Sequence, residues 1–159
     1  MNKKNIFRII LIVLIMLNCF MIFNFSSEKS EDSDITSGRV INRIIEVNPF
    51  TKNLEETKKE KIREVMVYPI RKSAHFTIYL CLGILVFLFC ETFTIENYKK
   101  ILASLMFSFI YACTDEIHQL FVPGRSGEIG DVFIDTSGAL LGIMIVYTIY
   151  KILKRKNRL

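Results

Sequence analysis

The sequence predicts an all-α membrane protein, a polytopic bundle of four transmembrane helices. The chain has 159 residues, of which 51% are hydrophobic. These hydrophobic residues fall in runs that are too long for an ordinary soluble core. A helix needs roughly 20 apolar residues to cross a bilayer. The runs that approach this length are 6–25, 73–90, 101–121 and 132–150.

The basic residues predict the orientation of the chain. Its net charge is +5, and Lys and Arg gather before the first run, between the second and third runs, and in the tail 151–159. Basic residues that flank short loops stay in the cytoplasm. We therefore expect a multi-pass protein of the plasma membrane with both termini in the cytoplasm. We expect no nucleic-acid partner, because a basic patch for nucleic acid would carry interleaved polar or aromatic contacts.

The first run, 6–25, is interpreted as an uncleaved helix, because no small-residue cleavage site follows Phe25. The polar segment 26–69 is then predicted to be one long extracytoplasmic loop. Two stretches within it have the amphipathic pattern of short helices, which could lie on the membrane surface or cover a site as a lid. The four cysteines fall inside predicted spans and show neither a disulfide framework nor a zinc spacing.

The second run opens with polar residues on one helical face. At about 100° per residue, Lys72, His75, Tyr79 and Gly83 project from the same side. Lipid would favour none of these side chains, so this face is expected to meet other helices. Lys72 is expected to neutralise Asp115 or the Asp131/Asp135 face. Arg71 points about 100° away from Lys72 and is interpreted as an anchor to headgroup phosphates.

The third run, 101–121, turns polar in its second half. Asp115, His118 and Gln119 share one helical face, whereas Glu116 points toward a different neighbour. The Pro-Gly pair before Arg125 then ends the helix in a turn.

Two carboxylates mark the start of the fourth run, 132–150. Asp131 could be only the N-cap of this helix, but Asp135 lies a full turn further in. Asp135 also shares a face with Gly138 and Gly142, whose small-xxx-small spacing lets helices approach closely. The carboxylates are therefore expected to face protein and not lipid.

With the predicted topology, these polar residues converge on the outer leaflet. A carboxylate at the centre of a lipid-facing helix costs about 2.5–3.5 kcal/mol. A chain that keeps four carboxylates near the membrane, at 115, 116, 131 and 135, is therefore expected to use them for a function. The candidate catalytic residues are Lys72, His75, Asp115, Glu116, His118, Asp131 and Asp135. The candidate substrate-binding residues are Tyr79, Gln119 and Arg125.

Several kinds of chemistry fit such a cluster. Carboxylates beside His and Lys suit acid–base catalysis, with Asp115 and His75 as the acid and base. No cofactor or metal site is predicted, because metal spacings such as HExxH are absent, although Asp and His can hold a divalent ion. A serine nucleophile is not supported, since GxSxG is absent. Alternatively, the protein is non-catalytic, and the cluster binds a ligand or only holds the bundle together.

These residues stand in motifs that resemble the VanZ-like membrane family. The motifs are KxxHFxxYxxxG from Lys72, DExHQxFVPGR from Asp115, DV and DTxG from Asp131 and Asp135, and the exit FNFSS ending at Ser27. The resemblance covers residues 6–150. The family is named for a protein associated with resistance to the glycopeptide teicoplanin, so the resemblance implies a cell-envelope role. Membrane lipid, an envelope glycan precursor or a glycopeptide is then the expected partner. The resemblance implies neither a mechanism nor an oligomeric state.

Overall fold

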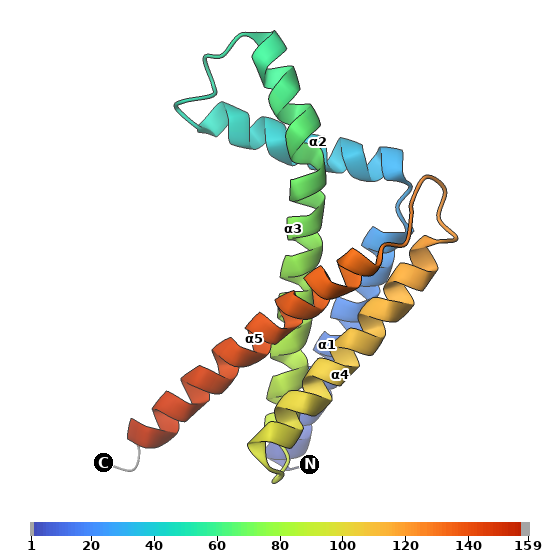
Figure 1. The fold of residues 1–159 in the computed structure, drawn as a ribbon. Helices are drawn as coiled ribbons and strands as arrows, with labels where there is room; N and C mark the ends of the chain where they lie inside the picture. The colour runs from blue at the N-terminus through green and yellow to red at the C-terminus, as the bar shows by residue number, and fades with distance from the viewer. Residues whose placement is uncertain (1, 157–159) are drawn as a thin grey trace.

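The computed structural model describes residues 2–156, and Figure 1 shows this part of the chain as helices joined by turns. The helices are α1 (Lys3–Ser27), α2 (Ser30–Val47), α3 (Glu56–Glu91), α4 (Asn97–Gln119) and α5 (Ile129–Lys156). The prediction of an all-α fold is confirmed. The last residues of the predicted basic tail, 157–159, lie outside the described residues.

Three of these helices, α1, α3 and α5, are long and apolar enough to cross a membrane. The prediction of four such helices is wrong, because α4 does not reach the same hydropathy over its 23 residues. Its apolar first half is followed by Asp115, Glu116 and His118, and two serines interrupt the apolar half. The run 101–121 was long enough for a span, but these polar residues lower its mean hydropathy.

α4 turns its polar side into the bundle. It packs against α1, α3 and α5, and its buried residues include Ser104 and Ser108. The Ser104 hydroxyl donates to the Lys100 carbonyl at 2.8 Å, and the Ser108 hydroxyl donates to the Ser104 carbonyl at 3.0 Å. These serines satisfy their hydrogen bonds within their own helix. Large apolar side chains such as Phe107 and Ile110 are exposed on the outward side of α4.

The segment predicted as one long loop, 26–69, is mostly helical. α2 lies across α3 in Figure 1, and its apolar residues Ile41 and Ile45 are buried. α3 is one continuous helix of 36 residues that contains Pro69. A proline in a helical pattern usually ends or kinks the helix, which is why the sequence suggested a surface helix and a separate span. Pro69 instead removes only one donor from a helix that continues.

α3 and α5 cross in close contact, because glycines leave room for the two backbones (Figure 1). A Cβ atom at Gly83 of α3 would overlap the backbone carbonyl of Ala139 on α5. A Cβ atom at Gly138 or Gly142 of α5 would overlap a backbone carbonyl of α3. The predicted close approach at the small-xxx-small pattern is confirmed.

The turn between α3 and α4 is held by polar contacts at the end of the bundle where α1 begins. Lys100 pairs with Glu91 at 3.0 Å, and both side chains are buried. Arg8 of α1 donates to the Thr92 hydroxyl at 2.9 Å and to its carbonyl at 3.0 Å. These contacts join α1, α3 and α4 at this end of the bundle.

Gly138→Ala is expected to destabilise the protein, because the added methyl group overlaps the Phe76 carbonyl and forces α3 and α5 apart. Overpacking of this kind costs about 1–3 kcal/mol. The matched control is Gly130→Ala, since a Cβ atom there meets nothing within 4 Å and alanine favours a helix. Thermal unfolding in detergent, followed by circular dichroism, measures both variants. Equal unfolding temperatures would contradict the close crossing.

Candidate functional site

Polar side chains meet at the end of the bundle where α4 ends and α5 begins. Three features lie here: a polar pocket, an apolar groove beside it, and a buried cluster of one histidine and two aspartates. α1, α3, the connection between α4 and α5, and α5 itself all contribute to this region.

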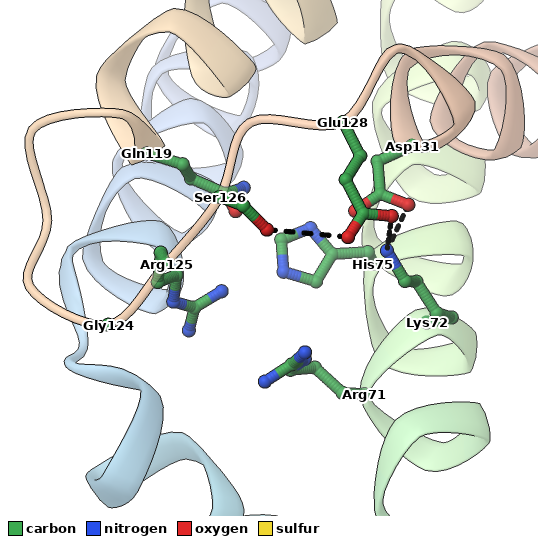
Figure 2. Close-up of a pocket in the computed structure, with 9 residues that line it drawn as sticks. All are labelled: Arg71, Lys72, His75, Gln119, Gly124, Arg125, Ser126, Glu128 and Asp131. Atoms are coloured by element: carbon green, nitrogen blue, oxygen red, sulfur yellow. Dashed lines mark hydrogen bonds and ion pairs between the residues drawn. The ribbon is translucent and has the colours of Figure 1, made fainter.

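The polar pocket combines cations and carboxylates in a small volume (Figure 2). Its cavity volume is about 50 Å³, which is room for roughly four water molecules or one small anion. It is lined by Arg71, Lys72, His75, Gln119, Gly124, Arg125, Ser126, Glu128 and Asp131. Three lining residues are permanent cations and two are carboxylates, so the pocket carries an excess of positive charge.

Two arginines supply that excess. Figure 2 shows the guanidinium groups of Arg71 and Arg125 in the pocket, on different elements. Arg125 donates to the carbonyls of Glu28 at 2.8 Å and Phe25 at 3.0 Å, which ties the α4–α5 connection to the end of α1. Burial lowers the pKa of Arg125, and the positive charge of Arg71 lowers it further. Arginine nevertheless stays protonated in proteins, so the pair favours an anionic ligand.

Lys72 of α3 is engaged by α5. Its ammonium group pairs with Asp131 and lies 3.7 Å from Glu128. The side chains of Lys72 and Asp131 are only 13% and 16% exposed. The prediction that Lys72 meets the Asp131/Asp135 face is confirmed, whereas its predicted alternative partner, Asp115, is not among its ion pairs in the described chain.

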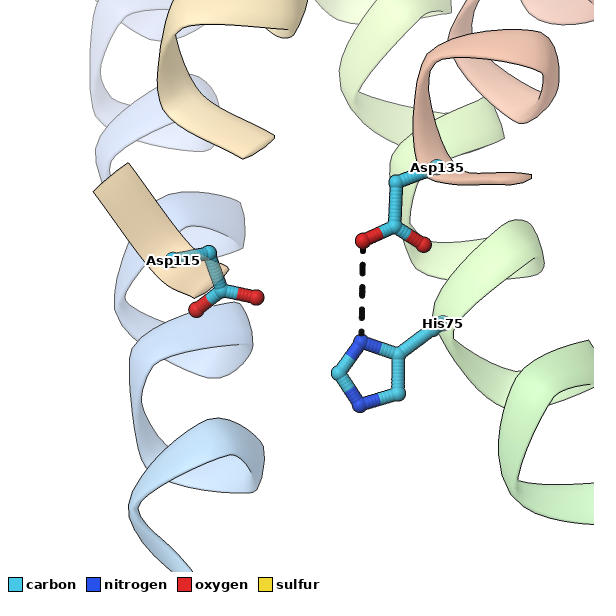
Figure 3. Close-up of side chains that lie close together, drawn as sticks. All are labelled: His75, Asp115 and Asp135. Carbon is cyan, nitrogen blue, oxygen red and sulfur yellow. Dashed lines mark ion pairs between the residues drawn. The ribbon is translucent and has the colours of Figure 1, made fainter. Parts of the chain in front are cut away.

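His75, Asp115 and Asp135 form the buried cluster (Figure 3). A potential ligand atom from each lies within 4.8 Å of those of the other two. His75 Nδ1 is 3.9 Å from Asp135 Oδ2, and the Ser26 hydroxyl donates to Asp115 at 2.9 Å. The cluster therefore joins α1, α3, α4 and α5 at one point.

The apolar groove adjoins the polar pocket. It has a cavity volume of about 180 Å³ and a mainly apolar lining that includes Ile22, Phe25 and Ile78. Arg71, His75 and Arg125 line both the groove and the pocket. A molecule with a charged head and an apolar chain can therefore contact both at once.

Two predicted catalytic residues, Glu116 and His118, lie outside both the polar pocket and the buried cluster. Glu116 accepts the backbone N–H of Glu128 at 2.8 Å, so it holds the α4–α5 connection in place. His118 stacks on Phe23 at 4.6 Å between ring centroids and lies 3.0 Å from the Ser27 hydroxyl, so it packs against α1. Glu116 faces a different neighbour, the α4–α5 connection, as predicted, but it also accepts from Gln119 at 3.2 Å, so it is not separated from the Gln119 face. The arrangement gives both residues a positioning role.

The two predicted binding residues on helices differ in their surroundings. Gln119 lines the polar pocket and lies 3.4 Å from the Ser26 hydroxyl. Tyr79 is fully buried in the core, and its hydroxyl has no hydrogen-bond partner within residues 2–156. Tyr79 therefore faces the bundle interior, as predicted from its helical face, but does not line the pocket.

A family model described as VanZ/LLP1 matches residues 9–152 of the chain. The chain belongs to the VanZ/LLP1 family. The resemblance drawn from the sequence motifs is therefore confirmed over nearly the whole chain. Membership and the three apolar helices together support a membrane protein. The searches of curated proteins and of solved structures found no match.

Sequence reasoning missed three residues of this VanZ/LLP1 site. Arg71 was assigned to lipid headgroups because it points away from Lys72, but α2 covers that side, and Arg71 contacts Asp34 at 3.2 Å. Glu128 was overlooked because it lies in an irregular connection. Ser26 stands in the exit motif of the first span, which was the available signal for its role beside Asp115.

Lys72→Met is expected to lower the yield of folded VanZ/LLP1 protein, because it leaves Asp131 without its cation. Removing one member of a buried pair costs about 3–5 kcal/mol, and the slight exposure of this pair favours the lower value. Adding Asp131→Asn should restore the yield, whereas adding Asp115→Asn should not. Size-exclusion chromatography in detergent measures the recovery of each variant. Equal rescue by both second substitutions would contradict the assigned pairing.

Proposed function

We propose that this protein binds the anionic headgroup of a membrane lipid in the polar pocket and the chain of that lipid in the apolar groove. The observation that supports the proposal is the junction between the two cavities. Arg71, His75 and Arg125 line both, so a headgroup at the arginines lies at the mouth of the groove.

The chemistry of the pocket favours a phosphate group. Guanidinium groups bind phosphate through paired, charge-assisted hydrogen bonds. Lys72 is engaged by Asp131 and Glu128. Arg71 pairs with Asp34 through one nitrogen, and Arg125 donates from two nitrogens to backbone carbonyls. A guanidinium carries five N–H donors, so both arginines keep donors for an anion. The volume of about 50 Å³ suits a single phosphate and not a large headgroup. Sugars attached to that phosphate would extend out of the pocket.

The apolar groove supports a lipid-linked ligand over a free anion. Ile22, Phe25 and Ile78 come from helices α1 and α3. The rest of the lining outside the shared residues is Glu28, Ser33, Thr36, Ser37 and Ala74. A groove of this composition contacts an acyl or prenyl chain and gains free energy from the apolar surface it buries. A lipid-linked envelope glycan precursor combines a phosphate with such a chain.

We place the site in the outer leaflet of the plasma membrane. The support is the charge pattern, because the basic residues near the start of α1 and the end of α5 favour the cytoplasm. This orientation requires α4 to cross the membrane with the three more apolar helices, and α4 runs along the bundle from one end to the other (Figure 1). The connection between α4 and α5 supplies part of the pocket lining, and it lies at the opposite end of the bundle from both of these helix ends (Figure 1). A role in teicoplanin resistance stays a prediction, because the family match names no activity.

A catalytic role has one specific observation in its favour. His75 belongs to the buried cluster and also lines the polar pocket. A headgroup bound at Arg71 and Arg125 therefore lies beside an imidazole that can exchange a proton with it. Asp115, the predicted partner in acid–base chemistry, lies in the same cluster.

Arg125→Gln is expected to weaken the binding of phosphatidylglycerol to the purified protein by roughly tenfold or more, because a hydrogen bond to a charged group contributes about 1.5–3 kcal/mol. The matched control is Arg39→Gln, which removes the same charge from an exposed residue of α2. Native mass spectrometry in detergent measures the lipid bound. Equal binding by the two variants, or equal binding of phosphatidylcholine by the parent, would contradict the headgroup site.

The proposed orientation predicts the position of reporter fusions along α3 and α4. A fusion at Asn97 should report from the cytoplasm, and a fusion at Glu56 should report from outside, because α3 separates these two positions. Paired alkaline phosphatase and fluorescent protein fusions measure the two locations. An external signal at Asn97 would contradict an outer-leaflet site.

A further inference from the structure

We infer that His75, Asp115 and Asp135 bind a divalent transition-metal ion. The three residues come from α3, α4 and α5, and each offers one ligand atom to a common space (Figure 3). The inference goes beyond the proposed lipid site, which needs no metal.

Asp135 is a buried carboxylate without a hydrogen-bond partner within residues 2–156, and its charge favours a bound cation. Its side chain is 1% exposed, and neither carboxylate oxygen has a hydrogen-bond partner among the described residues. The nearest basic nitrogen is His75 Nδ1, 3.9 Å from Asp135 Oδ2, which exceeds the length of a hydrogen bond. Lys72 is already paired with Asp131. A buried carboxylate without a partner is strongly unfavourable, so the interior must supply a proton or a metal ion.

The spacing of the three groups suits a metal ion. Zinc binds His nitrogen and carboxylate oxygen at roughly 2.0–2.2 Å, so ligand atoms around one ion lie roughly 3.4 Å apart. The observed atoms lie within 4.8 Å of one another. The gap between 4.8 Å and roughly 3.4 Å is within the range that a change of side-chain torsion can close.

Neighbouring polar groups orient one of the ligands. The Ser26 hydroxyl donates to Asp115 Oδ2 at 2.9 Å, and Gln119 lies 3.4 Å from that hydroxyl. Hydrogen bonds of this kind fix the direction of a metal-binding carboxylate. The Tyr79 hydroxyl lies one turn beyond His75 on α3 and is also buried without a partner in residues 2–156. It is therefore available to donate to a carboxylate or to a metal-bound water.

The ligand set selects the class of ion. One imidazole and two carboxylates suit Zn²⁺ or Mn²⁺, whereas soft ions such as Cu⁺ prefer sulfur. Three protein ligands leave at least one coordination position open, as in catalytic zinc sites. Because His75 also lines the polar pocket, that open position can accept a phosphate oxygen of the ligand. This last step rests on the proposed lipid site, but the metal site itself does not.

Metal analysis of the full-length protein tests the inference. After treatment with a chelator, the protein is dialysed against Zn²⁺ or Mn²⁺ in detergent, and its metal content is measured by mass spectrometry. We expect one bound ion per chain in the parent and in Glu128→Gln, which lines the pocket outside the cluster. Asp135→Asn and His75→Gln should each lose the ion.

Co²⁺ binding and thermal unfolding keep the test decisive if those variants fail to fold. In the parent, Co²⁺ should give visible absorption bands of a site with nitrogen and oxygen ligands, and Zn²⁺ should raise the unfolding temperature until a chelator is added. A parent that retains no ion, or an Asp135→Asn variant that binds as much as Glu128→Gln, would overturn the inference. The binding of phosphatidylglycerol to the metal-free protein is measured separately. If the lipid binds while no metal does, the metal site is wrong and the proposed lipid site stands.

Discussion

The close crossing of α3 and α5 is the constraint on which the rest of the site depends. Gly83 and Gly138 bring the two backbones together, because a Cβ atom at either position would overlap the other helix. Beyond this crossing, Lys72 meets Asp131, and His75 meets Asp135. Each pair joins one residue of α3 to one of α5. If the helices separated, Asp131 would lose the cation that balances its charge, and the loss of one partner of a buried ion pair is strongly destabilising.

The crossing produces two adjoining regions of opposite charge. The polar pocket has more cations than carboxylates among its lining residues, and Arg71 and Arg125 keep N–H donors beyond those used by Asp34 and the α1 carbonyls. The buried cluster has two carboxylates and one histidine, so it favours a cation. His75 belongs to both regions, and the apolar groove opens beside them. A phosphate bearing a lipid chain, next to a divalent ion, satisfies all three features together, because the charges of the phosphate and the ion also attract each other at this low-dielectric site.

Much of this arrangement follows from local patterns in the sequence. Helical periodicity predicted the face that carries Lys72 and His75, and glycine spacing predicted a close helix contact at Gly138. Helical periodicity gives the direction in which a side chain points but not the residue that it meets. It therefore did not distinguish Asp131 from Asp115 as the partner of Lys72. α3 continues through Pro69, and α2 packs across this helix, but local sequence patterns report neither feature. The same packing explains why the role of Arg71 was missed.

The central claim is that the polar pocket holds a lipid phosphate at its two arginines. Solid-state nuclear magnetic resonance tests it directly, by measuring dipolar contacts between lipid phosphorus and arginine nitrogen in bilayers that contain phosphatidylglycerol. The account predicts close phosphorus–guanidinium contacts that disappear when Arg71 and Arg125 are both replaced by glutamine and that persist in Arg39→Gln. If the contacts are unchanged in the double variant, the phosphate lies elsewhere and the proposed site is wrong.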